Sequence, residues 1–165
     1  MRLKDRVAIV TGGARGIGGA ISQLFAQEGA TVVIWDLLEN EGQATADEIR
    51  SQGGKAEFHK LSVSDPEAIQ DAAQKVFDAF GRIDILINNA GITRDKSFLK
   101  STMEEWQQVM DVNLSSVYYC AKSVVPFMQQ NNYGRIVSAS STTGLRGNFG
   151  QTNYAASKAG IIGMT

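Results

Sequence analysis

The sequence predicts an α/β fold in which helices cover both faces of a parallel β-sheet. Short, continuous apolar runs such as Val7–Val10 alternate with longer segments whose apolar residues recur at helical spacing. Such runs are typical of strands that are buried on both faces. Strands that alternate with helices form βαβ units, which pair in parallel and place helices on both sides of the sheet. We therefore expect a single domain with a doubly wound sheet of five strands.

The first half of the chain contributes three of these strands. Strand 7–10 is followed by a glycine-rich turn and by a helix that Gly29 ends. The apolar face of this helix consists of Ile17, Ile21, Leu24 and Phe25. Strand 31–35, a polar helix over 40–52 and strand 55–61 then follow.

A helix and a strand open the second half. Asp65 followed by Pro66 is typical of a helix start, because proline is favoured in the first turn, where its missing N–H is not needed. One face of this helix is apolar, and Gly81 ends it. Strand 83–87 comes directly afterwards.

The remaining elements are a long helix, a strand and a last helix. The pattern Thr102-x-x-Glu105 is typical of a capping box and predicts the start of the long helix. Pro126 is expected to kink this helix or to mark its last turns. Strand 134–138 is an expected open edge of the sheet, and a helix over 154–165 follows it.

The composition is typical of a globular chain and excludes several kinds of site. The 165 residues carry a net charge of −1, which favours neither nucleic acid nor an anionic membrane surface as a partner. A single cysteine, Cys120, and a single histidine, His59, exclude an internal disulfide and a metal site rich in these residues. No apolar run reaches the ~18 residues of a membrane span, and the first residues lack the apolar stretch of a signal peptide. We expect a cytoplasmic protein, and we interpret residues 1–165 as one domain that is incomplete at its C-terminus, with its last strands absent.

The first strand runs into a glycine-rich turn, Thr11-Gly-Gly-Ala-Arg-Gly-Ile-Gly18. Glycines at 12, 16 and 18 let the backbone approach a pyrophosphate, and the helix that follows directs free N–H groups and a partial positive charge at that anion. A tight strand–helix turn without a ligand is the alternative. The helix after the turn and an acid at the end of the second strand favour a Rossmann-like dinucleotide site instead.

The acid at the end of the second strand is Asp36, which directly follows Trp35. A carboxylate at this place accepts hydrogen bonds from the adenosine ribose hydroxyls and repels a 2′-phosphate. Arg15 is either a partner for a 2′-phosphate or a solvated loop charge. Because Asp36 is aimed at the ribose, we expect NAD as the cofactor, with NADP as the alternative.

Tyr154 and Lys158 lie four residues apart and therefore share one helix face. An ammonium beside a phenol favours the phenolate, so such a pair makes a proton donor and acceptor that works near neutral pH. A surface pair without a function is the alternative. Ser141 lies thirteen residues before Tyr154, just beyond the fifth strand, where it can hydrogen-bond a substrate carbonyl; Ser138 and Ser140 are its competitors.

Together these motifs resemble the short-chain dehydrogenase/reductase family over nearly the whole chain. The residues that carry the resemblance are the turn from Thr11 to Gly18, Asn88-Asn-Ala-Gly91, Asn113, Ser141 and Tyr154-x-x-x-Lys158. Within the family, the segments 91–95, 113–116 and 150–158 look most like 3-oxoacyl-[acyl-carrier-protein] reductases, with acetoacetyl-CoA reductases as near neighbours.

The resemblance implies a role for each of these residues. Asn113 would hold a water in a proton relay, Ser141 would orient the carbonyl, Tyr154 would be the general acid, and Lys158 would bind the nicotinamide ribose and lower the pKa of Tyr154. The implied cofactor-binding residues also include Gly12, Arg15, Gly16, Ile17, Gly18, Asp36, Ser62, Val63, Asn89, Ala90 and Gly91. The implied partners are an acyl thioester, the acyl carrier protein and further copies of the chain in a homotetramer.

Four features depart from the family's pattern. The family's members are longer, and Ser62-Val63 replaces a common Asp-Val at the adenine. Asp36 is atypical of the NADPH-using reductases of fatty acid biosynthesis, and the segment 129–132 is uncharged where those reductases often carry basic residues. The leading hypothesis is an oxidoreductase that reduces a 3-oxoacyl thioester. The alternatives are an NAD-dependent dehydrogenase of another secondary alcohol or hydroxyacyl-CoA, and a catalytically silent fragment that binds a dinucleotide.

Overall fold

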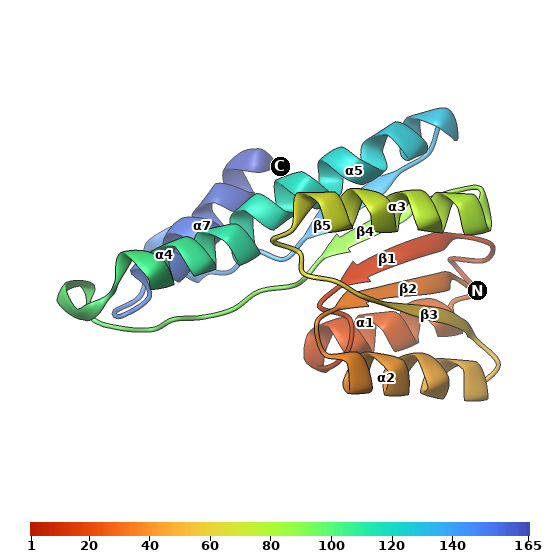
Figure 1. The fold of residues 1–165 in the computed structure, drawn as a ribbon, viewed down its shortest axis with the longest axis horizontal. Coiled ribbons are helices and arrows are strands. Elements are labelled where there is room, and N and C mark those ends of the chain that lie inside the picture. Colours follow the sequence, from red (N-terminus) through yellow and green to blue (C-terminus); the bar gives the residue numbers. More distant parts are fainter.

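A parallel sheet of five strands forms the centre of the computed structural model, which describes all residues, 1–165 (Figure 1). The strands are β1 (Val7–Thr11), β2 (Thr31–Asp36), β3 (Lys55–Lys60), β4 (Ile85–Asn88) and β5 (Arg135–Ser138). Their order across the sheet is β3-β2-β1-β4-β5, and every pair is parallel. The chain builds the sheet outward from β1 to β3 and then returns to the other side of β1 to add β4 and β5. The predicted doubly wound parallel sheet is confirmed.

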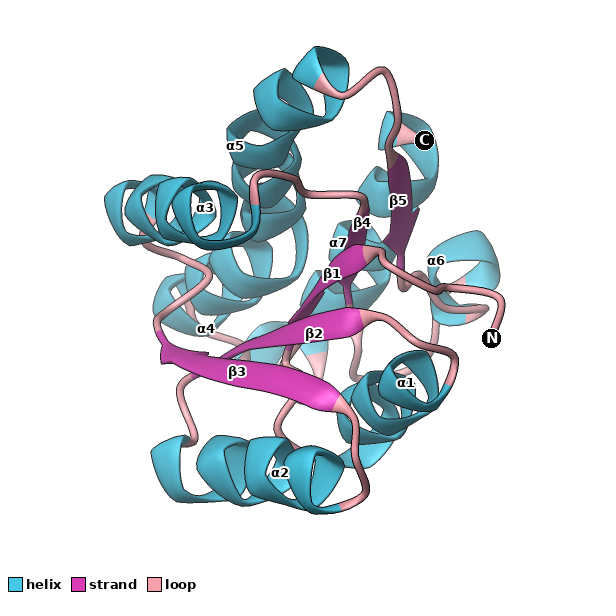
Figure 2. Cartoon of the chain, turned by 90° about the vertical axis from the view of Figure 1, so that its right-hand side faces the viewer, coloured by secondary structure: helices cyan, strands magenta, loops and turns pink.

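Helices cover both faces of this sheet, as Figure 2 shows. The helices are α1 (Gly16–Gln27), α2 (Glu39–Ser51), α3 (Pro66–Phe80), α4 (Met103–Met110), α5 (Ser116–Gln130), α6 (Thr143–Arg146) and α7 (Thr152–Met164). Helices α1 and α2 pack on one face, and α3 and α5 pack on the other. Helices α4 and α7 pack against each other beyond the carboxyl ends of the strands.

Two hydrophobic clusters, one on each face, hold the sheet between its helices. Val7 and Ile9 of β1 belong to a cluster of 15 buried residues with α3 and α5. Ala8 and Val10, whose side chains point the opposite way, belong to a cluster of 11 buried residues with α1 and α2. Every residue of β1 is buried because both faces are covered. This two-sided burial explains why the strand consists of a continuous apolar run.

The helix after Thr102 differs from the single long helix that we expected. The capping box is present, because the Thr102 side chain accepts from the backbone N–H of Glu105 and the Glu105 side chain accepts from that of Thr102. However, a π-helical turn over Asp111–Ser115 separates α4 from α5. An extra residue of this kind inside a helix shifts the direction of the side chains within the turn, and here the turn contains Asn113.

The other expected elements are present, with small shifts of their ends. Strand β4 begins at Ile85 and not at Ile83, and α7 begins at Thr152 and not at Tyr154. Helix α6 and the 3-10 turn over Phe98–Lys100 are too short to show a periodic pattern, and neither was predicted. Pro126 lies in the last turns of α5. None of the helices combines the length and the apolar character that crossing a bilayer would require.

Strand β5 lies at one edge of the sheet, as expected. It pairs with β4 on one side only, and its residues are far less buried than those of β1. Ile136 and Val137 are 37% and 57% exposed, although their paired residues Leu86 and Ile87 on β4 are buried. The sheet therefore presents an unpaired apolar strand to the solvent.

Candidate functional site

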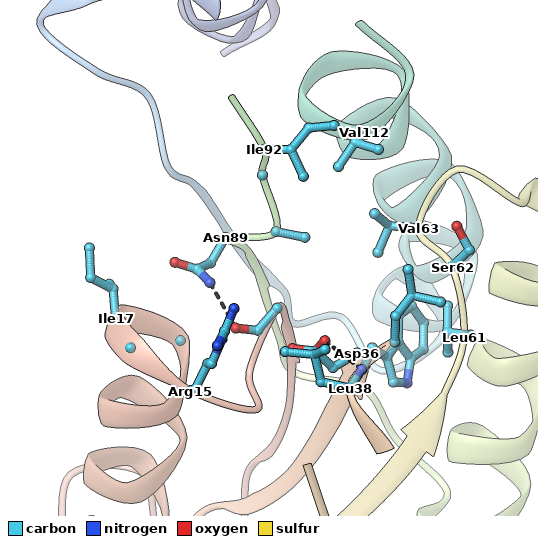
Figure 3. Close-up of a pocket in the computed structure, with 17 residues that line it drawn as sticks. Arg15, Ile17, Asp36, Leu38, Leu61, Ser62, Val63, Asn89, Ile92 and Val112 are labelled. Atoms are coloured by element: carbon cyan, nitrogen blue, oxygen red, sulfur yellow. Dashed lines mark hydrogen bonds between the residues drawn. The ribbon is translucent and has the colours of Figure 1, made fainter. Parts of the chain in front are cut away.

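The carboxyl ends of the strands meet at one edge of the sheet, and a cavity of ≈ 470 Å³ opens there. It lies where the direction of strand addition reverses, since residues that follow β1 and β4 both border it. Figure 3 shows Arg15 and Ile17 on one side of the cavity and Ser62 and Val63 on the opposite side. Open α/β sheets bind their ligands at such a reversal point.

Hydrogen bonds join the ends of β1 and β4 beneath this cavity. The Thr11 hydroxyl accepts from the backbone N–H groups of Asn89 and Ala90, both at 3.1 Å. In return, the Asn89 side-chain amide donates to the carbonyls of Thr11 and Gly12, both at 3.1 Å. The motif that contains Asn89 therefore holds the two central strands together at the edge of the cavity.

The glycine-rich turn leaves the start of α1 open to an anion. No side chain caps the first turn of α1. The free N–H groups of this turn form the positive end of the dipole of a 12-residue helix. Gly12 and Gly16 have positive φ angles of 62° and 59°, which side chains other than glycine rarely adopt. A Cβ atom on Gly18 would lie 2.0 Å from the Gly12 carbonyl oxygen, so only glycine allows this close approach. The turn therefore offers backbone donors to a ligand in the cavity.

Asp36 borders the cavity at the end of β2, and its carboxylate is already engaged by the backbone. One carboxylate oxygen accepts from the N–H of Ala14 and the other from the N–H of Leu38, both at 3.1 Å. Each oxygen has further lone pairs, so these two bonds leave acceptor capacity for a ligand hydroxyl. Asp36 thus lies where we expected it and also fixes the glycine-rich turn relative to β2, which the sequence analysis did not predict.

Tyr154 and Lys158 form a second group, on α7. The ammonium of Lys158 lies 5.7 Å from the centre of the Tyr154 ring, so the predicted shared helix face is present. Lys158 is only 5% exposed, and its burial lowers the pKa of the ammonium. The ammonium donates to the carbonyl of Ala139, at 2.6 Å, in the segment after β5. The Tyr154 hydroxyl makes no hydrogen bond within the protein.

Asn113 is fully buried and lies between the cavity and the helix α7 that carries Tyr154 and Lys158. Its side-chain oxygen accepts from the N–H of Ile92 at 2.8 Å, and its amide donates to the Ile92 carbonyl at 2.9 Å. The amide also donates to the Ser157 hydroxyl at 3.3 Å, which joins the π-helical turn to α7. A methyl group on Gly91, which lines the cavity, would lie 3.4 Å from the Asn113 oxygen and 3.8 Å from the Lys158 ammonium. Only the backbone of Gly91 therefore lies between the cavity and the side chains of Asn113 and Lys158.

The three serines after β5 have different partners. Ser138 accepts from the side chain of Asn88, and Ser140 donates to the Lys158 carbonyl at 2.8 Å. Ser141 accepts from the N–H of Thr143 at 3.2 Å, which leaves its own hydroxyl hydrogen free to donate to a ligand. Helix α6, which follows Ser141, packs so closely on α7 that a Cβ on Gly144 would lie 2.7 Å from the Ala159 nitrogen. This packing holds the Ser141 segment next to α7.

The cavity brings together eleven of the residues singled out in the sequence. They are Gly12, Arg15, Gly16, Ile17, Gly18, Asp36, Ser62, Val63, Asn89, Ala90 and Gly91. Asn113, Ser141, Tyr154 and Lys158 do not line it and lie on the far side of Gly91 or after β5. The side chain of Ile17 is 76% exposed and not packed against the turn.

Six further residues line the cavity and were not predicted: Trp35, Leu37, Leu38, Leu61, Ile92 and Val112. Five of them directly adjoin a residue that was predicted, and Leu38 lies two positions after Asp36. This adjacency was the only signal in the sequence. Trp35 is fully buried and packs in the core, as expected, although its indole N–H has no hydrogen-bond partner. These side chains give the cavity a largely apolar lining beside the glycine-rich turn.

The chain is similar to known proteins over almost its whole length. The family model described as short chain dehydrogenase matches residues 6–165. The chain is 47% identical to a 3-oxoacyl-[acyl-carrier-protein] reductase FabG of Thermotoga maritima, over 100% of this chain and 67% of that protein. It is 42% identical to the FabG of Escherichia coli, over 100% of this chain and 66% of that protein. A peroxisomal multifunctional enzyme type 2 of Drosophila melanogaster is 43% identical over 99% of this chain and 28% of that protein.

The chain thus spans about two thirds of the length of the bacterial relatives that it matches. The match nevertheless covers every element of the fold, from the glycine-rich turn to the helix that carries Tyr154 and Lys158. A family match over almost the whole chain, together with the Rossmann-like sheet, assigns the protein. The chain belongs to the short-chain dehydrogenase family.

Proposed function

We propose that the chain is the dinucleotide-binding domain of an oxidoreductase that transfers hydride from a nicotinamide cofactor to the ketone of a 3-oxoacyl thioester. The observation that carries this proposal is the position of Lys158 and Asn113 directly behind Gly91, at the wall of the cavity. The acid–base pair and the binding cavity thereby share one edge of the sheet. The FabG proteins among the relatives, whose name states that they reduce 3-oxoacyl-[acyl-carrier-protein], support this substrate class.

The residues at the cavity fit a dinucleotide. The uncapped start of α1 supplies donors for a pyrophosphate, and an added Cβ on Gly16 would meet no atom within 4 Å, so this part of the turn faces open space. Asp36 supplies an acceptor for ribose hydroxyls. The apolar side chains of Leu38, Val63 and Val112 line the region where an adenine would be sheltered from water.

We propose NAD(H) as the preferred cofactor. A 2′-phosphate bound next to Asp36 would face the carboxylate, and two such charges about 4 Å apart repel by up to ~4 kcal/mol at a surface-like dielectric, less once solvent screens them. Arg15 also lines the cavity and makes no ion pair with Asp36 or any other acid, so it is free to offset part of this repulsion. The carboxylate is fixed by two backbone N–H groups, whereas the Arg15 side chain is exposed.

The acid–base step belongs to the residues on α7 and after β5. The nicotinamide supplies the hydride when it is bound. Tyr154 would donate its phenolic proton to the carbonyl oxygen, and Ser141 would orient that oxygen with its free hydroxyl hydrogen. The buried ammonium of Lys158 stabilises the phenolate that remains, and its low exposure strengthens this interaction because little water screens it.

Steady-state kinetics of a conservative variant test the proposal. We expect the chain to oxidise NADH with acetoacetyl-CoA, and we expect Tyr154→Phe to lower kcat by at least ~100-fold, because it removes the general acid and keeps the ring. Tyr133→Phe is the matched control, since Tyr133 precedes β5, at the end of the sheet opposite the cavity, where its ring packs on Arg6 and Arg135; its kcat should stay within about twofold of wild type. Undiminished turnover by Tyr154→Phe would contradict the acid–base assignment.

Asp36 favours a second candidate, an NAD-dependent dehydrogenase of another secondary alcohol or hydroxyacyl-CoA. A carboxylate at the cavity suits NAD⁺, which commonly serves oxidation, whatever the substrate. Reduction of NAD⁺ with 3-hydroxybutyryl-CoA, compared with a simple secondary alcohol such as 2-butanol, distinguishes the two candidates. If the chain binds NADH, as followed by fluorescence, and turns over none of these substrates, it is a binding domain without activity of its own.

The proposed partners are acyl carrier protein, as donor of the thioester, and further copies of the chain in a homotetramer. Helices α5 and α7 are the candidate surfaces for self-association, because Tyr118 and Ile162 leave half-exposed aromatic and apolar side chains on them. Sedimentation equilibrium measures the oligomeric state directly. Substrate competition between acetoacetyl-CoA and an acetoacetyl carrier protein measures which carrier is preferred.

A further inference from the structure

Ala14, in the middle of the glycine-rich turn, is held from both sides by residues of other elements. Its N–H donates to the Asp36 carboxylate at 3.1 Å, and its carbonyl accepts from the hydroxyl of Thr45 at 2.7 Å. Thr45 lies on α2 and does not line the cavity. Ala14 is only 2% exposed, so water does not readily replace a lost partner of its backbone groups. The turn is thus anchored to β2 and to α2 at a single residue.

The bond from Thr45 is the only hydrogen bond that the Ala14 carbonyl accepts within the protein. Arg15 is the N-cap of α1, and its carbonyl accepts the first helical bond, from the Gly19 N–H at 3.0 Å. The Gly18 N–H lies in the first turn and, as in other helices, has no acceptor in the protein. Thr45 therefore fixes the segment that directly precedes these free N–H groups.

We propose that Thr45 is a positioning residue that keeps the glycine-rich turn open, with the Gly18 N–H available to the pyrophosphate of a dinucleotide. This inference rests on the proposed function, because it concerns the same cavity. Thr45 acts from behind the turn, through the Ala14 carbonyl, and touches no ligand itself. Without the Thr45 hydroxyl, the buried Ala14 carbonyl loses its partner, and the turn keeps only the bond from the Ala14 N–H to Asp36 as an anchor.

Ligand binding by three variants of the purified chain tests this role. Thr45→Val keeps the shape and removes the hydroxyl, and we expect it to raise the Kd of NADH and of ADP by about fivefold, the effect of one net hydrogen bond. Thr45→Ser restores the hydroxyl and should return both Kd values to within about twofold of wild type. Ser51→Ala is the matched control, since it removes a hydroxyl from the same helix that bonds only to the carbonyl of Glu48.

Adenosine distinguishes positioning of the turn from a general structural effect. Because adenosine has no phosphate, Thr45→Val should leave its Kd unchanged, whereas a damaged fold would weaken adenosine and ADP alike. Equal Kd values of wild type and Thr45→Val for ADP would overturn the role of Thr45 while the dinucleotide site stands. If wild-type chain binds neither NADH nor ADP, both the inference and the proposed function are wrong.

Amide hydrogen exchange of the wild-type chain tests whether the Gly18 N–H is free for a ligand. The same measurement on Thr45→Ala, in which ADP should protect Gly18 less than in wild type, tests the role of the hydroxyl if Thr45→Val does not fold. We expect the Gly18 amide to exchange rapidly in the free chain and at least ~10-fold more slowly with saturating ADP, because only the ligand offers it an acceptor. The Ala26 amide, deep in α1, should be slow in both states. A Gly18 amide that is as protected as Ala26 in the free chain would refute the proposal.

Discussion

At the scale of single residues, Asp36 has a structural role at the place where we propose that a cofactor binds. Its carboxylate holds the N–H groups of Ala14 and Leu38 and borders the cavity at the same time. The charge and the two hydrogen bonds are separable, because an amide of the same shape retains one acceptor oxygen. The variant Asp36→Asn therefore isolates what the negative charge contributes to the choice of cofactor.

We expect Asp36→Asn to shift the ratio of Kd values for NADPH and NADH by about tenfold in favour of NADPH. The reason is that loss of the charge removes the repulsion between Asp36 and the 2′-phosphate. After screening by solvent, this repulsion amounts to ~1.4 kcal/mol, which corresponds to a tenfold change in Kd. Fluorescence titration with both cofactors measures the ratio. Arg15→Gln is the companion variant, and it should shift the ratio in the opposite direction. An unchanged ratio in Asp36→Asn would show that Asp36 does not face the 2′ position.

At the scale of elements, a buried carboxylate joins β1 to β4 at the end of the sheet opposite the cavity. Asp84 is fully buried and accepts from the N–H of Val7 at 2.9 Å. It also pairs with Arg6 at 2.9 Å and with Arg82 at 2.6 Å. Burial by itself raises the pKa of Asp84, but the bonds from Arg82, from Val7 and from Arg6 together outweigh it and hold the pKa below the usual value. The anion is therefore the form that stabilises the two central strands.

We expect Asp84→Asn to lower the free energy of unfolding by about 3 kcal/mol at neutral pH. The reason is that it removes the buried negative charge that pairs with Arg6 and Arg82. The contribution of Asp84 has a defined pH window. Its folded pKa lies below the unfolded value of ~3.9, so the stabilisation is complete above that value and is lost as the pH falls through the lower, folded pKa.

Urea denaturation of wild type and Asp84→Asn between neutral pH and about pH 2 measures both effects. The two stabilities should approach each other at the acid end of this range. Asp71→Asn, at an exposed position of α3 without a hydrogen bond, is the control and should change stability by less than about 0.5 kcal/mol. A difference between wild type and Asp84→Asn that does not depend on pH would contradict the account.

At the scale of the whole molecule, the sheet ends in an apolar strand that pairs on one side only. Ile136 and Val137 of β5 are 37% and 57% exposed, and an unpaired strand edge of this composition attracts other chains. We expect the 165-residue chain to form large, concentration-dependent species, and we expect Val137→Lys to reduce them, since a charge on an edge strand opposes pairing.

Sedimentation velocity over a range of concentrations checks this prediction. Leu145→Lys is the control, because Leu145 is 74% exposed but lies on α6, away from the strand edge; it should leave the large species unchanged. An equal decrease in both variants would indicate a general effect of added charge. A defined oligomer that persists in Val137→Lys would be attributed to the helices and not to the sheet edge.

The sequence by itself determined the order of the elements, the parallel sheet and the composition of the glycine-rich turn. These features depend on local patterns: continuous apolar runs for strands covered on both faces, glycines where backbone must approach backbone, and caps such as Thr102 with Glu105. It also placed the candidate residues near the carboxyl edge, because parallel strands bring their ends together.

Only the tertiary structure decided which backbone groups those residues hold. Asn113 bonds to Ile92, 21 positions away, from a π-helical turn that no periodicity predicts, and Thr45 reaches Ala14 across 31 positions from a helix that looks merely polar in the sequence. The exposure of β5 likewise depends on its place at the edge of the sheet and not on its apolar residues. Contacts of this kind depend on how distant elements pack, and a single-sequence pattern contains only the spacing of neighbours along the chain.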